Sequence, residues 1–156
     1  MGLGLGNILG HPLDTVSTTQ HHPQGHVVCP DNDGRFYAYF KYLQATIKGS
    51  PVSLKYSAGD LCVTNVFATG VRGAGVCIVS GGAAGSYGWV QISGKGKVNL
   101  RVTGTVSART KLYFSETGKA MAPAITTTTA NCFIEAIAAK SGTNVVAGKY
   151  FIYGGM

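Results

Sequence analysis

Hydrophobic and polar positions alternate in short runs along most of the chain after residue 34. The clearest run covers residues 35–43, and its two sides carry different side chains: Phe36, Ala38, Phe40 and Tyr42 on one, Arg35, Tyr37, Tyr39, Lys41 and Leu43 on the other. Because successive side chains point to opposite faces of a strand, this run predicts a half-buried strand. We expect its first side to face the core.

Further alternating or apolar runs follow, separated by turn residues such as Gly, Pro, Asn and Ser. They cover residues 52–56, 61–68, 76–79, 87–93, 97–102, 110–115 and 144–153. Residues 131–139 fit either a strand or one face of a helix, and the turn at 141–144 with the run after it favours a strand. This spacing predicts an all-β fold: a single β-barrel or β-sandwich-like domain of about nine or ten short strands.

Residues 1–34 differ from the rest of the chain. They hold all four histidines and three of the five prolines, with only small apolar groups at Leu3, Leu5, Ile8, Val27 and Val28. So few apolar side chains cannot form a core, and the prolines limit any strand here to a short or edge position. The pattern predicts an extended N-terminal arm, 1–34, that is either disordered or laid across another surface. We expect the β domain, 35–156, to fold without residues 1–30.

The composition suits one domain with one core. The 156 residues are 45% hydrophobic and only 12% charged, with 23 glycines. The four cysteines are far apart and form no CxxC pair, which indicates buried reduced thiols instead of disulfides or a metal site. No run approaches the roughly 18 apolar residues of a membrane-spanning helix, so we expect no membrane partner.

The net charge of +7 arises from 13 Lys and Arg against 6 Asp and Glu. The positive side chains begin at Arg35 and are spread singly or as open pairs, without the dense basic tract that is typical of nucleic-acid-binding proteins. The charge therefore favours solubility or contact with an acidic partner surface, and we do not expect a nucleic-acid partner.

The sequence contains no arrangement of residues that indicates catalysis. The spacing of the four histidines matches no zinc pattern, and residues 31–34 resemble the start of a calcium loop whose twelfth position is Tyr42 instead of Glu. No glycine-rich run ends in the Lys-Ser/Thr of a phosphate loop, and no Ser lies in a Gly-x-Ser-x-Gly setting. We therefore predict a protein that is not an enzyme and uses neither a metal nor another cofactor.

The aromatic side chains favour protein contacts. The chain has eight Tyr and one Trp, and such rings bury a large area while keeping a polar tip. With the apolar groups of the arm they make up the predicted protein-interaction residues: Leu3, Leu5, Ile8, Val27, Val28, Tyr37, Tyr39, Tyr87 and Trp89. Trp89, at the start of the strand that follows the glycine-rich turn at 81–88, is interpreted as either a core residue or a subunit contact.

Several segments together resemble the small decoration, or cement, proteins of tailed bacteriophage capsids. The most specific is Gly85-Ser86-Tyr87-Gly88-Trp89-Val90-Gln91-Ile92-Ser93-Gly94, accompanied by the strands at 33–39, 98–102 and 133–139 and by Leu112-Tyr113-Phe114. The resemblance covers about residues 33–140, and these motifs are strand and turn signatures, with no catalytic residue among them.

Members of that family trimerise on the outer face of the shell and clamp neighbouring major capsid subunits. The resemblance therefore implies a homotrimeric capsid decoration protein that binds the outer surface of a phage head and stabilises the lattice of the major capsid protein. The implied location is the outer capsid surface of the virion, after synthesis in the host cytoplasm. The alternative function is a phage fibre or adhesion module whose aromatic side chains bind carbohydrate.

Overall fold

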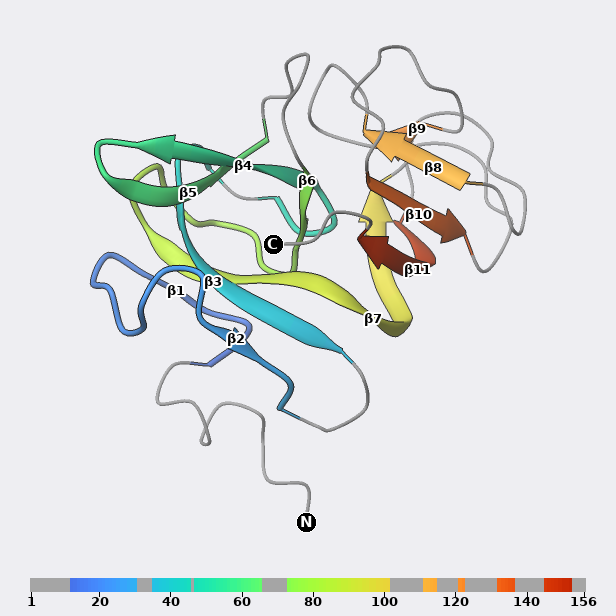
Figure 1. The fold of residues 1–156 in the computed structure, drawn as a ribbon, viewed down its shortest axis with the longest axis horizontal. Coiled ribbons are helices and arrows are strands. Elements are labelled where there is room, and N and C mark those ends of the chain that lie inside the picture. Colours follow the sequence, from blue (N-terminus) through green and yellow to red (C-terminus); the bar gives the residue numbers. More distant parts are fainter. Residues whose placement is uncertain are drawn as a thin grey trace.

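The computed structural model describes residues 12–30, 35–45, 47–65, 73–101, 111–114, 121–122, 132–136 and 145–152, with side-chain surroundings as far as Ser93. Every regular element among these residues is a β-strand (Figure 1). The predicted all-β class is therefore confirmed for this part of the chain. It holds no helix that is long and apolar enough to cross a membrane.

The first sheet contains seven strands. They are β1 (Val16–Ser17), β2 (Val27–Val28), β3 (Phe36–Tyr42), β4 (Pro51–Ser57), β5 (Asp60–Thr64), β6 (Gly73–Cys77) and β7 (Tyr87–Arg101). Strands β4 and β5 form a hairpin whose turn residues, Ala58 and Gly59, have φ angles of 52° and 85°. Positive φ at both central positions is the conformation that matches the twist of a two-residue hairpin.

Five of these strands pair in a closed cycle, in the order β3-β5-β4-β6-β7 and back to β3. The β3–β5 step is parallel, and the other four are antiparallel. Strand β3 shares its second edge between two neighbours, because β5 pairs with Lys41 and Tyr42 while β2 pairs with Tyr37 and Ala38. The short strands β1 and β2 are attached to the cycle through β7 and β3.

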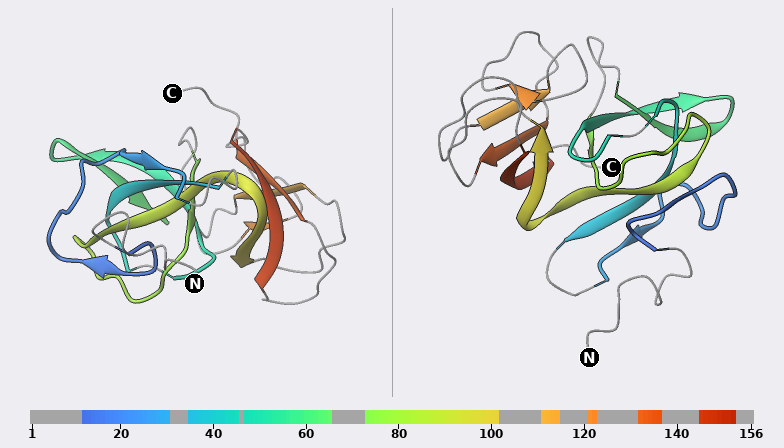
Figure 2. Two further views of the ribbon diagram at one scale, coloured as in Figure 1. Left: turned by 90° about the horizontal axis from the view of Figure 1, so that it is seen from below. Right: turned by 180° about the vertical axis from the view of Figure 1, so that it is seen from behind.

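Strand β7 joins this cycle to a second group of strands (Figures 1 and 2). That group contains β8 (Lys111–Phe114), β9 (Met121–Ala122), β10 (Cys132–Ala136) and β11 (Val145–Ile152), and β11 pairs with the second half of β7. The sequence predicted two strands separated at Gly94, but β7 continues through it. Gly94 pairs with Tyr150, and an irregularity between Gly148 and Tyr150 absorbs the extra residues of β7, as a β-bulge does.

The ambiguous segment 131–139 contains strand β10, so the strand interpretation is confirmed for Cys132–Ala136. Its register is set on both sides, because Ile134 pairs with Tyr150 of β11 and with Leu112 of β8. A strand in the interior of a sheet has both backbone edges paired, which favours the extended form over a helix at this position.

The inner core is formed by side chains from the strands of the cycle. Its buried members are Ala38, Phe40, Tyr42, Val52, Val63, Ala74, Cys77 and Val90, with Val16, Leu54, Leu61 and Ile92 packed against them. The predicted core side of β3 is confirmed for Ala38, Phe40 and Tyr42. Phe36 is different, since it begins the strand and remains 40% exposed.

Candidate functional site

A second core lies on the opposite face of β3 and β7. It consists of the buried side chains Leu13, Tyr37, Tyr39 and Trp89, with Val28, Ile78 and Tyr87 packed against them. Because Tyr39 and Trp89 are antiparallel partners on neighbouring strands, their side chains lie on the same face of the sheet. Both faces of β3 are therefore buried, although the alternation of its sequence predicted only one.

The segment that buries this second face is residues 12–30, which we term the covering segment. Its strand β1 pairs with Tyr87 and Gly88 of β7, and its strand β2 pairs with Tyr37 and Ala38 of β3. Two further backbone hydrogen bonds attach the covering segment to β3: Gly25 N donates to Tyr39 O (2.7 Å), and Tyr39 N donates to His26 O (3.0 Å). The described part of the predicted arm is thus laid across the β domain.

The structure places three aromatic residues of the predicted interaction set inside the fold. The side chains of Tyr37, Tyr39 and Trp89 are buried, those of Tyr39 and Trp89 completely, which agrees with the interpretation of Trp89 as a core residue. A ring without accessible surface cannot offer area to a partner. These residues belong to the second core because Leu13 and the covering segment exclude solvent from them.

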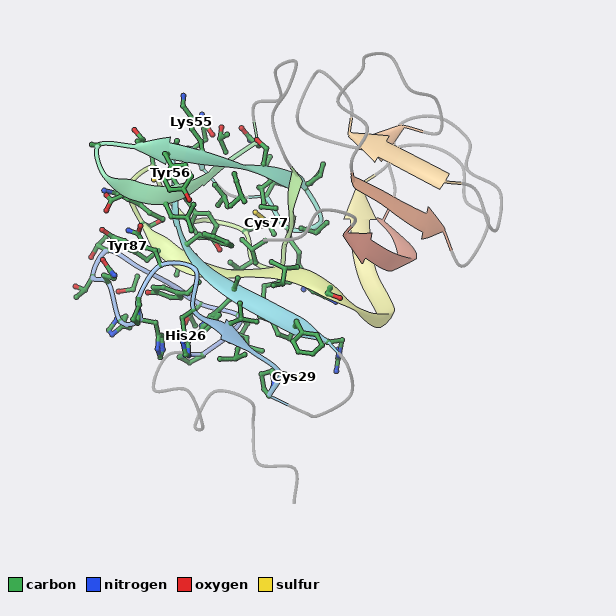
Figure 3. The ribbon with its side chains drawn as sticks, viewed as in Figure 1. His26, Cys29, Lys55, Tyr56, Cys77 and Tyr87 are labelled. Carbon is green, nitrogen blue, oxygen red and sulfur yellow. The ribbon has the colours of Figure 1, made fainter. Side chains whose placement is uncertain are left out.

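Aromatic rings of the covering segment pack directly on this core. The His22 ring lies 5.0 Å from the Trp89 ring and 5.2 Å from the Tyr39 ring, measured between centroids. His26 stacks on His22 at 5.7 Å with an interplanar angle of 7°. Figure 3 shows His26 and Tyr87 on the side of the molecule that carries β1 and β2, away from Cys77 in the inner core.

The phenol of Tyr39 is held by the same segment. Its hydroxyl accepts a hydrogen bond from the backbone N–H of His21 at 3.2 Å. Burial raises the pKa of Tyr39, while this hydrogen bond acts in the opposite direction and the neighbouring Tyr87 raises it further. The neutral phenol is therefore the form that the site holds, and it serves as a fixed anchor for the covering segment.

Gln24 attaches the covering segment to the β4–β5 hairpin. Its Oε1 accepts a hydrogen bond from Leu61 N (2.6 Å), and its Nε2 donates to Asp60 Oδ1 (3.1 Å). The other carboxylate oxygen of Asp60 accepts from Lys41 Nζ at 2.6 Å. The hydrogen bond from Lys41, and then that from Gln24, lowers the pKa of Asp60, while the bond to Asp60 raises the pKa of Lys41. One carboxylate thus links β3, β5 and the covering segment.

Known proteins do not identify this arrangement. No family model, curated protein or solved structure matches the chain. The side chains that the fold leaves at the surface therefore indicate where a partner could bind.

Among the described residues, the large hydrophobic side chains with the greatest exposure are Val27 at 37%, Phe36 at 40% and Tyr56 at 79%. Val27 pairs with Ala38, which lies two residues from Phe36 on β3, so Val27 and Phe36 share one face at adjacent strands. We term these two residues the edge patch. Tyr56 lies apart from it, just before the β4–β5 turn, with the exposed Lys55 beside it (Figure 3).

The predicted interaction residues are therefore divided by the fold. Val27 is in the edge patch, while Val28 and Tyr87 are partly buried against the second core. Leu3, Leu5 and Ile8 lie outside the described residues. Sequence reasoning missed Phe36 and Tyr56, although their positions carried a signal: each lies within two residues of a turn-like segment, where a strand loses its cover.

The described residues offer little space or reactivity for chemistry. No group of three or more His, Cys, Asp or Glu side chains lies close enough there to hold a metal ion. A hollow lined by Tyr42, Val63 and Cys77, among others, has a volume of about 10 Å³, room for about one water molecule. The predicted buried thiols are confirmed for Cys62 and Cys77, which are free and whose pKa values burial raises, to about 12 for Cys77.

Proposed function

We propose that this chain is a capsid decoration protein that binds the outer surface of a phage head and stabilises the lattice of the major capsid protein. The observation that carries the proposal is an exposed apolar edge patch, Val27 and Phe36, beside a core in which Trp89 of the most specific segment is fully buried. Exposed apolar side chains that adjoin one another are typical of protein contact surfaces.

The fold supports the same proposal. Residues 85–94, the most specific part of the resemblance, supply the half of β7 that pairs with β1, β3 and β6. We infer that the closed cycle of β3, β5, β4, β6 and β7 is a small β-barrel, because a sheet whose first and last strands pair has no free edge within the cycle. In this proposal residues 85–94 help to build the fold, and the edge patch makes the contact with the capsid.

The proposal includes the partners and the location. The partners are the major capsid protein and further copies of this chain in a homotrimer, whose symmetry multiplies a small contact on each subunit. The net charge of +7 favours an acidic shell surface. The protein is then a non-enzymatic component of the outer capsid surface, made in the host cytoplasm, with neither a membrane nor a nucleic acid among its partners.

A carbohydrate-binding fibre or adhesion module is the second candidate. It is favoured by one observation, the 79% exposure of Tyr56 beside Lys55, because an exposed aromatic ring can stack on a sugar. Trp89, the single Trp of the chain, is fully buried. Among the described residues, Tyr56 is the most exposed ring that a carbohydrate site could use.

One experiment distinguishes the two candidates. The purified chain is added to expanded phage shells prepared without it, and bound protein is measured after sedimentation, in parallel with binding to a glycan array. Decoration predicts shell binding that Val27→Ser with Phe36→Ser reduces at least tenfold and that Tyr56→Ser leaves unchanged. Glycan binding lost in Tyr56→Ser, without binding to shells, would favour the fibre module. Absence of shell binding by the unmodified chain would refute decoration.

A further inference from the structure

The His22 ring is enclosed where it has no polar partner. It packs against Trp89 at 5.0 Å and edge-on against Tyr39 at 5.2 Å. Its Nε2 atom is buried and makes no hydrogen bond with any described residue. A neutral imidazole loses one hydrogen bond at Nε2 in this position. A protonated imidazole would in addition carry a charge, and its Nε2–H donor would have no acceptor.

His26 adds a second titratable ring directly on the first. The two imidazoles stack at 5.7 Å and are nearly parallel, at 7°. Two neutral rings tolerate this arrangement, but two imidazolium ions at this separation repel each other, even though His26 is exposed and water screens part of the repulsion. Protonation therefore disfavours the stack as well as the enclosed Nε2 atom of His22.

One interaction acts in the opposite direction. A cation within about 6 Å of an indole ring is attracted to it. His22 is within this range of Trp89 and of the Tyr39 ring at 5.2 Å, while His26, at 6.3 Å from Trp89, is beyond it. These attractions oppose separation, whereas the repulsion between the two charged rings and the unpaired donor of His22 favour it.

The charged and titratable groups around the stack do not offset its charge. On β3 and β7 they are the phenols of Tyr39 and Tyr87, which stack on each other at 6.3 Å. Asp60, which Gln24 connects to the covering segment, is already paired with Lys41. Within the segment, His21 has its Nε2 3.0 Å from Ser17 Oγ, and Asp14 is exposed.

We propose that the covering segment, residues 12–30, is an acid-sensitive cover on the β domain. Protonation of both His22 and His26 separates it from β3 and β7 and exposes Tyr37, Tyr39 and Trp89 while the closed cycle of strands stays folded. This device does not depend on the capsid role, because it follows from the contacts within one chain.

The experiment uses the full chain and its single Trp. Acrylamide quenching of Trp89 fluorescence is measured from pH 8 to pH 5, the range in which imidazoles titrate. We expect the quenching constant to rise several-fold towards pH 5. The double variant His22→Gln with His26→Gln should flatten this rise, and His21→Gln, which changes the neighbouring exposed imidazole, should keep it.

Hydrogen exchange distinguishes release of the covering segment from unfolding of the whole domain. After correction for the intrinsic pH dependence, the amides of Gly25 and Tyr39 should lose protection at pH 5, since both donate across the contact with the cover. The amide of Leu43, which donates to Val63 within the cycle, should keep its protection. If the double variant does not fold, His26→Gln alone removes the stack and should reduce the pH response.

Three outcomes would overturn the proposal. The first is quenching that is constant or falls on acidification, which would mean that attraction to Trp89 prevails. The second is a loss of protection at Leu43 in parallel with Gly25, which would mean global unfolding. The third is a pH response of Trp89 quenching that is unchanged in the folded double variant. If the double variant does not fold, the same result in His26→Gln counts instead.

Discussion

The hydroxyl of Tyr42 on β3 donates a hydrogen bond to the backbone carbonyl of Trp89 on β7, across 2.9 Å of buried interior. The Tyr42 ring belongs to the inner core, and the Trp89 ring belongs to the second core on the other face. The residue before Trp89 must be small for this contact, because a Cβ on Gly88 would come within 2.9 Å of the Tyr42 hydroxyl. The Gly-Trp pair of the motif therefore has a structural reason.

Replacing Tyr42 with Phe should remove this connection without creating a large cavity. We expect the free energy of unfolding to fall by about 1 kcal/mol, the net value of a buried hydrogen bond. Urea denaturation followed by circular dichroism measures it. Tyr56→Phe is the matched control, because Tyr56 is exposed and its hydroxyl should contribute nothing. Equal stability of the two variants would contradict the structural role of the bond.

Gly75→Ala should destabilise the protein more than any glycine replacement in an open turn. A Cβ on Gly75 would collide with the backbone carbonyl of Gln91 on the neighbouring strand, which cannot move without disturbing the sheet. We expect a loss of more than about 2 kcal/mol. Gly81→Ala is the control, since Gly81 has a φ of 94° and open space around it, and should cost about 1 kcal/mol. Comparable losses measured by urea denaturation would refute the close approach.

Stability should fall in alkali because of Cys77. Burial raises the pKa of this thiol to about 12 from an ordinary 9.0, so the unfolded chain loses the proton first. The stabilisation is complete below about pH 9 and decreases as the pH rises from there, by up to about 1.4 kcal/mol per pH unit. Burial of Tyr42, whose pKa is also raised, adds a further decrease above about pH 10.

The measurement is the free energy of unfolding at pH 8, 9 and 10 in the presence of a reducing agent. Cys77→Ala should lower stability at pH 8 by leaving a cavity, yet show a flatter decline towards pH 10. Cys29→Ala serves as the control, since it removes a thiol that is only partly buried. A Cys77→Ala slope that equals the unmodified one would show that this thiol does not govern the alkaline decline.

Gln24→Ala should loosen the covering segment from the β4–β5 hairpin. The change leaves Leu61 N without its acceptor and removes one donor to Asp60. We expect hydrogen exchange at the Leu61 amide to accelerate at least tenfold, because it loses a 2.6 Å hydrogen bond. Gln20→Ala is the control, since Gln20 is exposed and its side-chain amide donates to the backbone carbonyl of His22, within the covering segment itself. Equal exchange rates in both variants would exclude a role for Gln24.

The effect of removing N-terminal residues on stability should depend strongly on where the chain is cut. Deleting residues 1–30 uncovers Trp89 and Tyr39, each of which buries about 150–250 Å². At about 25 cal/mol per Å² this costs several kcal/mol, a large part of the 5–15 kcal/mol that stabilises a typical domain. We expect the truncated chain to keep the closed cycle of strands folded, but with several kcal/mol less stability, and to aggregate through the uncovered rings.

Deleting only residues 1–11 is the matched truncation, because it keeps Leu13 and the rest of the covering segment. This variant should keep a cooperative thermal transition by circular dichroism. A cooperative, soluble product from the 1–30 deletion would show that the second core does not need its cover.

Part of the site could be predicted from the sequence, and part could not. The alternation in residues 35–43 identified Ala38, Phe40 and Tyr42 as core residues, because period-two patterning follows directly from strand geometry. The same pattern left Tyr37 and Tyr39 free for a surface role. Whether they are exposed depends on residues 12–30, an earlier segment of the chain, and no local pattern shows what another segment covers.

The sequence by itself determined the all-β class, the positions of most strands and the polar, proline-bearing character of the first 34 residues, since these depend on local side-chain chemistry. The tertiary structure alone decided that β3 closes a cycle by pairing with both β5 and β7 and that β7 continues through Gly94. It also decided that the covering segment buries Trp89 under His22 and His26. Each of these outcomes depends on backbone pairing between residues far apart in the chain, which is selected by the packing of the whole domain.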